Sequence, residues 1–313
     1  MALRNEAPAQ VATVAVFRHR TLADREDLLG RLMLAPAMAY VLLLVGAPLV
    51  LALLLSFSAA TAGSLSFSWV GLRNFATIVS DPQFHSALSN TVLFTVVSQA
   101  LVVILATAGA FVLDAAFVGR RLVRFLILLP WAAPVSLAAM AWTWIFDSTF
   151  SVINWTLKVA GVLHGWFYWF GDPTLAKIAI IAVHVWRTFP FATVIVLAGR
   201  ASIPRDISEA AVIDGAGFWR KLFQVEMPLL LPIVTVAVLF GVVFTSTDLG
   251  IVYLLTRGGP YNSTHVLASL AFQRGILGAD LGQGAAIALF LLPVLIVVAA
   301  AMLRLARRTE VGT

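Results

Sequence analysis

The stretch EAAVIDGAG, residues 209–217, lies in a polar break between two long apolar runs. An acidic, alanine-rich helical turn that ends in glycine forms readily in water and has no use inside lipid. Its position between the apolar runs indicates a segment of a membrane protein that contacts something soluble. The apolar runs on either side of this stretch therefore decide the fold.

The composition of the 313-residue chain is that of a membrane protein. It is 61% hydrophobic and 12% charged, with a mean hydropathy of +0.96, whereas a soluble domain averages about 45–50% apolar and about 25% charged residues. The chain has no cysteine, which excludes disulfides, zinc thiolate sites and iron–sulfur clusters. The net charge of +6 is typical of nucleic-acid binding, but the distribution of the charges indicates a topological cause instead.

Six apolar segments are long enough to cross a bilayer, because about 20 mostly apolar residues span roughly 30 Å of hydrocarbon. Backbone groups must be satisfied internally in lipid, so these segments are predicted to be helices. They are too long for the strands of about ten residues in an outer-membrane barrel. The predicted fold class is all-α, a polytopic membrane helix bundle with six transmembrane helices near 32–57, 88–113, 122–146, 175–199, 229–252 and 284–303.

Lys and Arg residues determine the predicted orientation. Six spans place both termini on one side, and 15 of the 21 Lys and Arg residues fall in the termini or in the two loops of that side. Four fall on the opposite side, and Lys177 and Arg187 fall within the fourth span. Because positively charged loops stay in the cytoplasm, both termini and the 209–217 stretch are predicted to be cytoplasmic. Nucleic-acid binding is therefore not expected.

The loop predicted on the outer side, about 147–174, is rich in aromatic residues. Trp and Tyr rings settle at the level of the lipid headgroups, so we expect a short helix on the outer membrane surface. A sugar-stacking platform is the alternative. The residues concerned are Trp155, Trp166, Tyr168 and Trp169.

The 209–217 stretch is predicted to belong to a helix of about two turns. Asp206 can cap its start, with Glu209 three residues later as the partner in a capping box. Gly215 suits the left-handed position that ends a helix. A second short helix is expected over about 217–227, ending at Pro228.

One face of the first short helix combines Ile207, Ala210, Ala211 and Asp214, at helical spacing. The two alanines allow another surface to approach closely. Two helical turns are marginal in isolation, so the segment needs support from a partner or from its own bundle. A surface loop folded against its own bundle is the structural alternative.

The polar break resembles the EAA loop of ATP-binding-cassette (ABC) importer permeases in Glu209–Ala211, Asp214–Ala216, Met227-Pro228 and Pro232. Over residues 70–290 the chain is similar to the carbohydrate-uptake branch of that family, which includes the maltose and glycerol-3-phosphate permeases. The supporting stretches are Gly71–Phe75, Asn90-Thr91, Pro130–Ala132 with Pro134, Trp142–Phe146, Val185–Arg187 with Pro190-Phe191, Ala198-Gly199, Ile203-Pro204, Asp248, Tyr253–Thr256, Gly258–Pro260, Gly282 and Ala285-Ala286.

The resemblance implies a MetI-like permease fold, carried by a multi-pass protein of the bacterial or archaeal cytoplasmic (inner) membrane. We expect a cytoplasmic N-terminal segment over 1–31, a transmembrane permease domain over 32–303 and a cytoplasmic tail over 304–313. Within the permease domain, a core is expected over 85–303 and a coupling loop over 200–228.

The resemblance also implies a subunit rather than a complete pump. Its partners would be a second permease subunit, two cytoplasmic ABC ATPase subunits, an extracytoplasmic solute-binding protein and the lipid bilayer. The chain has no Gly-x-x-x-x-Gly-Lys-Ser/Thr phosphate loop, so we expect a non-catalytic subunit that binds no cofactor, with ATP and Mg held by the partner ATPase. The expected ATPase-coupling residues, on a coupling helix, are Asp206, Ser208, Glu209, Ala210, Ala211, Asp214, Gly215 and Ala216.

The implied function is import of a sugar or related polyol by ATP-driven, binding-protein-dependent alternating access. Glycerol or a glycerol phosphodiester is the alternative solute. A stand-alone secondary transporter is an alternative from another class, although the chain shows no self-similar halves of the kind such carriers often have. A membrane enzyme is a third, but the sequence has no metal-ligand cluster and no Ser/His/Asp set.

Polar residues within the spans are candidates for the translocation pathway. A mid-membrane arginine costs at least about 2.5–3.5 kcal/mol on insertion scales, so Arg187 should face a cavity or a partner. It either contacts the solute or pairs with Asp248 of the fifth span. His184, Asn90 and Gln99 are expected to hydrogen-bond within the helix packing, and Gln99 is kept as a pathway candidate too. The candidate pathway residues are Arg187, Asp248, Thr247, Trp186 and Gln99.

Overall fold

The structure is a computed structural model that describes residues 26–64, 67–162 and 164–310. The chain divides into two compact units, residues 1–51 and 52–313. Most of the predicted 1–31 segment, and residues 311–313 of the predicted tail, lie outside the described residues. The helices, with η for a π-helical turn, are α1 (Glu26–Val41), η2 (Leu42–Gly46), α2 (Ala47–Ser56), α3 (Arg73–Val79), α4 (Pro82–Asp114), α5 (Arg120–Leu126), α6 (Leu129–Ala132), α7 (Val135–Ile145), α8 (Val152–Val159), α9 (Pro173–Ser202), α10 (Arg205–Ile213), α11 (Phe218–Lys221), η3 (Leu222–Glu226), α12 (Met227–Ser246), α13 (Gly250–Leu255), α14 (Leu267–Phe272), η4 (Gln273–Leu277), α15 (Leu281–Leu289) and α16 (Leu291–Glu310).

The apolar runs form helices, as predicted. Within the described residues, five helical segments are long and apolar enough to cross a membrane, and a bent pair of helices brings the number to six. Four of the five segments overlap their predicted spans closely, and the fifth is displaced along the chain. The segments are Gly30–Ser56, Pro82–Asp114, Pro173–Ser202, Leu281–Arg304 and, displaced, Phe218–Ser246.

The third predicted span, 122–146, is not one helix. Its two parts, Arg120–Ala132 and Val135–Ile145, meet at an angle of 94°. The residue before a proline avoids the helical region of the backbone, and Ala133, just before Pro134, is extended with ψ of 137°. The proline therefore ends the first part and begins the second in a new direction.

The fifth predicted span, 229–252, was placed too late, and the separate helix expected over 217–227 does not exist. One helical segment runs from Phe218 through Pro228 to Ser246. Proline lacks an N–H and crowds the preceding turn, and the chain widens there into η3, where Met227 N donates to the carbonyl of Leu222 five residues back. The widened turn lets the helix continue through Pro228.

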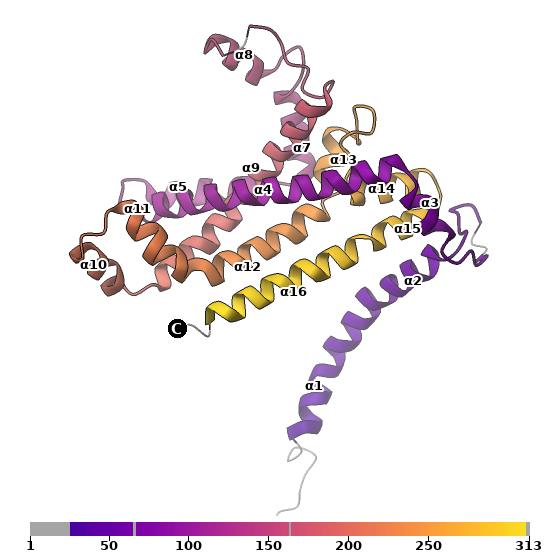
Figure 1. Cartoon of the computed structure of the whole chain (residues 1–313), viewed down its shortest axis with the longest axis horizontal. Coiled ribbons are helices and arrows are strands. Elements are labelled where there is room, and N and C mark those ends of the chain that lie inside the picture. The colour runs from indigo at the N-terminus through magenta and orange to yellow at the C-terminus, as the bar shows by residue number, and fades with distance from the viewer. Residues whose placement is uncertain (1–25, 65–66, 163, 311–313) are drawn as a thin grey trace, which may run out of the picture. The chain divides into compact units, whose positions relative to one another are not determined.

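Three long helices form the centre of the larger unit. α4 and α9 make the most extensive helix–helix contact, and α12 packs on both. Their buried side chains are small or branched, and Gly109 of α4 lies so close to α9 that a Cβ there would be 3.0 Å from the side chain of Thr193. Figure 1 shows α10 and α11 at one end of these helices and α13, α14 and α15 at the other.

The aromatic loop contains the short helix expected there, α8. Trp155, Trp166 and Tyr168 are exposed, which suits a surface position. Trp169 is instead buried: its ring packs 5.0 Å from that of Phe146, and its Nε1 donates to Asn154 at 3.0 Å. The fourth aromatic residue therefore belongs to the core and not to a surface platform.

Candidate functional site

The first candidate site is α10, the helix of the EAAVIDGAG stretch. It begins at Arg205, after an extended Pro204 that makes no side-chain capping hydrogen bond. The predicted capping box is therefore wrong: Asp206 lies inside the first turn, because the proline has already set the start of the helix. There its negative charge still favours the helix N-terminus.

The end of α10 follows the prediction. Gly215 has φ of +76°, a left-handed conformation that favours glycine. Gly215 N donates to the carbonyl of Val212, and Ala216 N donates to that of Ala211. These two bonds form a Schellman motif, which turns the chain sharply towards α11.

The faces of α10 differ from the predicted one. Ala211 is 9% exposed and Ser208 is half-buried, so this side of the helix faces its own bundle. Ala210, which was expected to share a face with Ala211, is exposed. Of the predicted coupling residues, the exposed ones are Asp206, Glu209, Ala210, Asp214 and Gly215, and Ala216 is half-buried. Apolar side chains next to them are also exposed, among them Val212, Ile213, Phe218 and Trp219.

The second candidate site is a groove of about 670 Å³ in the larger unit. α6, α7, α9, α12 and α13 contribute to its wall. Arg187, Thr247 and Asp248, three of the predicted pathway residues, line it. Trp186 and Gln99 do not. The lining residues are Trp131, Val135, Ser136, His184, Arg187, Thr188, Phe244, Thr247, Asp248, Leu249, Gly250 and Leu254.

Trp131 forms the aromatic part of the groove. Its ring stacks on Phe191 with centroids 4.5 Å apart and meets Phe244 edge-on at 5.7 Å. The guanidinium carbon of Arg187 lies 5.7 Å from the same ring, within the range of a cation–π contact. Neither Trp131 nor Phe244 was predicted as a site residue: Trp131 stood out only as part of the family-like stretch Pro130–Ala132, and Phe244 only as an aromatic residue in an apolar run.

Asp248 is not inside the fifth span. It lies in the break between α12 and α13, where its Oδ1 accepts from Ile251 N at 3.1 Å. Its Oδ2 lies 3.1 Å from His184 Nδ1. The ion pair between Arg187 and Asp248, which was the structural alternative, is therefore not formed: Asp248 pairs with His184. The Nε of Arg187 is buried and has no hydrogen-bond partner among the described residues.

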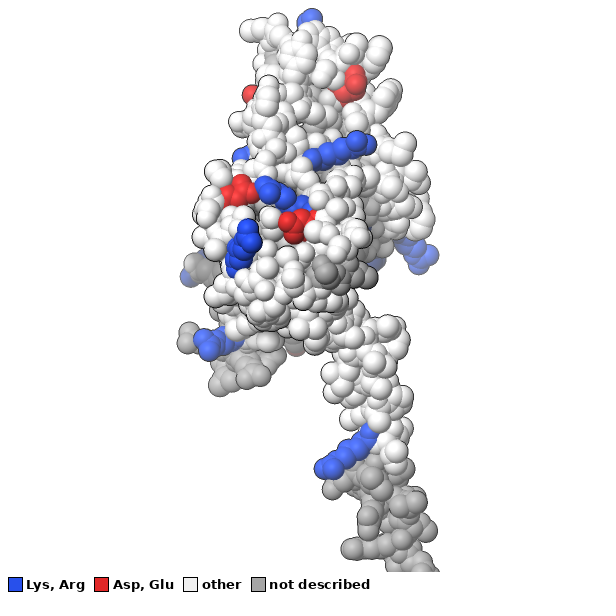
Figure 2. Space-filling model, turned by 90° about the vertical axis from the view of Figure 1, so that its right-hand side faces the viewer, with Lys and Arg blue, Asp and Glu red and all other residues white. Residues whose placement is uncertain are grey.

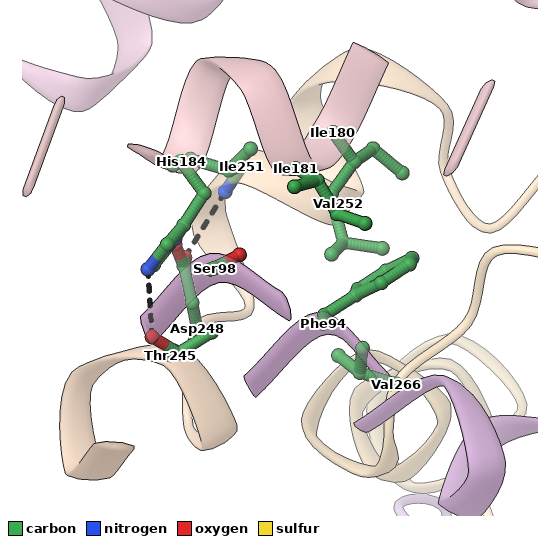
Figure 3. Close-up of a pocket in the computed structure, with 10 residues that line it drawn as sticks. All are labelled: Phe94, Ser98, Ile180, Ile181, His184, Thr245, Asp248, Ile251, Val252 and Val266. Atoms are coloured by element: carbon green, nitrogen blue, oxygen red, sulfur yellow. Dashed lines mark hydrogen bonds and ion pairs between the residues drawn. The ribbon is translucent and has the colours of Figure 1, made fainter. Parts of the chain in front are cut away.

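A chain of hydrogen bonds continues from His184 into the core (Figure 3). His184 Nε2 lies 2.8 Å from Thr245 Oγ1, the contact marked in Figure 3. Thr245 Oγ1 also accepts from Gln99 Nε2 at 2.8 Å and donates to the carbonyl of Gly241 at 2.7 Å. The single hydroxyl proton of Thr245 is thus used, so His184 Nε2 carries a proton. Gln99 therefore joins α4 to α12, the packing role expected of it.

The hydrogen bonds of His184 determine the net charge of the His184–Asp248 pair at the groove. With Nε2 protonated, His184 is either a cation facing an ionised Asp248 or a neutral ring facing a protonated one. In both cases the pair is neutral overall. Arg187 is then the one uncompensated charge among the groove-lining residues, and it faces the open volume.

The opposite end of the bundle from α10 is held by an ion pair between Arg274 and Asp81. Arg274 Nη2 also donates to Gln83 Oε1 at 2.9 Å, and Asp81 caps α4 by accepting from Gln83 N at 2.8 Å. η4 is thereby joined to the start of α4. Figure 2 faces this end and shows a few charged side chains of both signs close together on a largely uncharged surface.

Comparisons with known proteins agree with one another. Residues 107–311 match the family described as "Binding-protein-dependent transport system inner membrane component". The chain is 35% identical over 268 residues to the trehalose/maltose transport system permease protein MalF of Thermococcus litoralis, covering 86% of this chain and 90% of that protein. It is 33% identical over 290 residues to the sulfoquinovosyl glycerol transport system permease protein SmoG of Agrobacterium fabrum, covering 92% and 93%. A crystal structure of a bacterial ABC transporter that imports the acidic polysaccharide alginate matches with a TM-score of 0.77 at 21% identity, covering 90% of this chain and 96% of that one.

Proposed function

We propose that this chain is the permease subunit of an ATP-driven importer of a sugar or related polyol. The chain belongs to the family of binding-protein-dependent transport system inner membrane components. The chain is a multi-pass membrane protein and a transport component. The solute class is supported by the relatives, since trehalose, maltose and sulfoquinovosyl glycerol are all carbohydrates or their derivatives. Glycerol or a glycerol phosphodiester is the alternative solute.

The observation that carries the proposal is the exposed surface of α10. A helix between two membrane-spanning segments that exposes Glu209, Ala210 and Ile213 together presents acidic, small and apolar groups to one partner. We propose that Asp206, Glu209, Ala210, Asp214 and Gly215 contact a partner ATPase, which holds ATP and Mg. Ser208 and Ala211 then support the helix from below, and Ala216 holds its C-terminal turn.

The groove is our candidate for the solute pathway. Phe191 stacks on the ring of Trp131 and Arg187 lies over it, so Trp131 offers a sugar an apolar edge, and the donors of Arg187 suit the hydroxyl oxygens of the sugar. In the proposed cycle, closure of two ATPase subunits moves α10, the bundle opens outward, and solute passes from an extracytoplasmic binding protein into the groove. Hydrolysis by the partner returns the bundle to its inward-open state. A second permease subunit completes the passage.

From the Lys and Arg distribution we infer that both termini and α10 lie in the cytoplasm. The relatives from Thermococcus litoralis and Agrobacterium fabrum support a bacterial or archaeal inner membrane. The outer end, with the Arg274–Asp81 pair, then faces the binding protein. This orientation places the ATPase-contacting helix where ATP is available.

Purification and reconstitution test the proposal against a stand-alone secondary transporter. A tagged chain, expressed with its neighbouring genes, should bring down an ABC ATPase. Proteoliposomes of that complex should take up labelled disaccharides, polyols or glycerol phosphodiesters only with binding protein outside and ATP inside. Uptake by the chain reconstituted alone, without ATP, would refute the proposal.

A further inference from the structure

Beneath α10 lies a cluster of four charged residues and one serine, and the transport function described above uses only the serine. We name it the anchor cluster: Asp114, Arg200, Ser208, Lys221 and Glu226. It borders a polar groove of about 450 Å³. Its members come from the end of α4, the last turn of α9, the middle of α10, the end of α11 and the end of η3. Residues from α4, α9, α10 and the helical segment that begins at Phe218 therefore meet at one cluster.

Glu226 is the centre of the anchor cluster. Its side chain is 3% exposed, and both oxygens have partners. Oε2 accepts from Arg200 Nη1 at 2.5 Å, and Oε1 accepts from Ser208 Oγ at 3.3 Å and lies 3.5 Å from Lys221 Nζ. A buried carboxylate is tolerated only when it is paired and hydrogen-bonded, so the position of each partner is tied to that of Glu226.

Arg200 extends the connection to α4. Its Nη2 lies 3.1 Å from Asp114 Oδ2, and its guanidinium carbon lies 3.5 Å from the centroid of the Phe111 ring. The guanidinium is a planar fork, which suits binding two carboxylates at once. It therefore joins Glu226, at the base of α12, to the end of α4.

Ser208 is what connects α10 to this cluster. Among the described residues, its bond to Glu226 is the one side-chain hydrogen bond from α10 to another element. Ala211, one turn later on the same side, is buried against the bundle. The rest of α10 is largely exposed, so its position depends on these two contacts and on its short links to α9 and α11.

We propose that Arg200 and Glu226 are positioning residues that make α10 move as one body with the ends of α4, α9 and α12. α10 belongs to the loop that runs from Arg200 to Glu226, so their ion pair holds the two ends of that loop together. Separating those ends would leave a buried charge without its partner, which is strongly unfavourable, so a displacement of the loop with α10 is passed to the three long helices. The inference rests on the proposed function of α10 as the coupling helix. The anchoring itself can be tested without any ATPase.

The chain has no cysteine, so a single introduced thiol reports its own surroundings. In inverted membrane vesicles holding the full chain without ATPase, the thiol of Ala211→Cys should react slowly with a water-soluble maleimide and that of Ala210→Cys quickly. Adding Glu226→Gln or Arg200→Gln should raise the labelling rate at position 211 about tenfold, because α10 then opens locally more often, and should leave the rate at position 210 unchanged. Arg220→Gln removes a positive charge outside the anchor cluster and should change neither rate.

Ser208→Ala keeps the buried ion pair and removes only the bond from α10. It should therefore raise the labelling rate at position 211 even where Glu226→Gln reduces the amount of folded protein. In the assembled importer, Glu226→Gln should lower solute uptake per ATP hydrolysed, whereas a loss of folded protein would lower uptake and hydrolysis together.

An unchanged labelling rate at position 211 in both Ser208→Ala and Glu226→Gln would overturn the proposal that the anchor cluster holds α10. A raised rate there with a normal ratio of uptake to hydrolysis would overturn its part in coupling. A failure of the chain to bind any ATPase would instead refute the proposed function. The labelling rates would still test whether the anchor cluster holds α10.

Discussion

His184 Nδ1 and Asp248 Oδ2 lie 3.1 Å apart, and this pair decides what Arg187 can do. Asp248 is the acidic residue that lines the groove, and it is committed to His184 and to the backbone of α13. Arg187 is left with the face of Trp131 and the open volume of the groove. The charge of Asp248 is thus used within the structure, whereas that of Arg187 is free to contact the solute.

Removing the histidine should destabilise the chain. His184→Ala leaves the half-buried Asp248 without its closest partner. Removing one partner of a fully buried pair costs about 3–5 kcal/mol, so the loss here should lie below that range. We expect a markedly lower unfolding temperature in detergent, measured by intrinsic tryptophan fluorescence. His85→Ala, at an exposed histidine, should change it little. Equal unfolding temperatures for the two variants would contradict the pairing.

Arg187→Ala should reduce transport without removing the chain from the membrane. A hydrogen bond to a charged group contributes about 1.5–3 kcal/mol, so uptake at low solute concentration should fall about 10- to 100-fold. Arg187→Lys should recover part of it. The measurements are uptake of labelled solute and the amount of chain in the membrane. Absence of the alanine variant from the membrane would show a structural role instead.

Gly241 should tolerate a side chain only if Gln99 gives way. A Cβ at Gly241 would lie 2.0 Å from Gln99 Oε1, so Gly241→Ala alone should cost about 1–3 kcal/mol of stability through overpacking. Gln99→Ala in the same chain should restore part of that loss. Thermal unfolding of the two single variants and the double variant measures the interaction. Additive losses would show that the two residues do not share space.

Gly215→Val should impair uptake far more than Gly217→Val. Gly215 has φ of +76° at the end of α10, where a non-glycine residue costs about 1–3 kcal/mol. Gly217 has φ of −68° and open space around its Cα, so it serves as the matched control. Uptake and ATP hydrolysis should become uncoupled in the first variant alone. Normal uptake in Gly215→Val would count against the coupling role.

Reversing the charge of Glu209 should also uncouple hydrolysis from uptake. The side chain is exposed on α10, so Glu209→Lys should leave insertion and thermal stability within about 0.5 kcal/mol of the original. We expect uptake to be lost while the ATPase still binds or hydrolyses ATP. A wild-type ratio of uptake to hydrolysis would argue that Glu209 does not take part in the contact.

The spans were predictable because they depend on one simple quantity, the length of an apolar run. The exceptions depend on prolines, which act differently at each position. Pro190 and Pro232 lie inside continuous helices, whereas Pro134 begins a new helix after a turn of 94°. Whether a proline bends or breaks a helix in a membrane depends on which neighbours satisfy the freed backbone groups, and those neighbours are set by tertiary structure.

The candidate site was predictable in its residue types but not in its pairing. Arg187 and Asp248 both stood out as charges in apolar runs, and both line the groove. That Asp248 binds His184 follows from where α12 ends, a boundary set by the break at residues 247–249. Arg200 and Glu226 gave no local signal at all, because an ion pair 26 residues apart in sequence becomes visible only once α10 has folded back.

The right-angle turn between α6 and α7 has a consequence for the surroundings of the groove. Neither half is long enough to cross roughly 30 Å of hydrocarbon alone, since 13 residues of helix rise about 20 Å. The non-helical peptide at the corner therefore needs protein or water beside it. Trp131 and Val135, which flank that corner, also line the groove. Lipid acyl chains cannot form hydrogen bonds with the backbone groups at this corner. The groove side of the subunit therefore has to stay hydrated or be covered by another polypeptide.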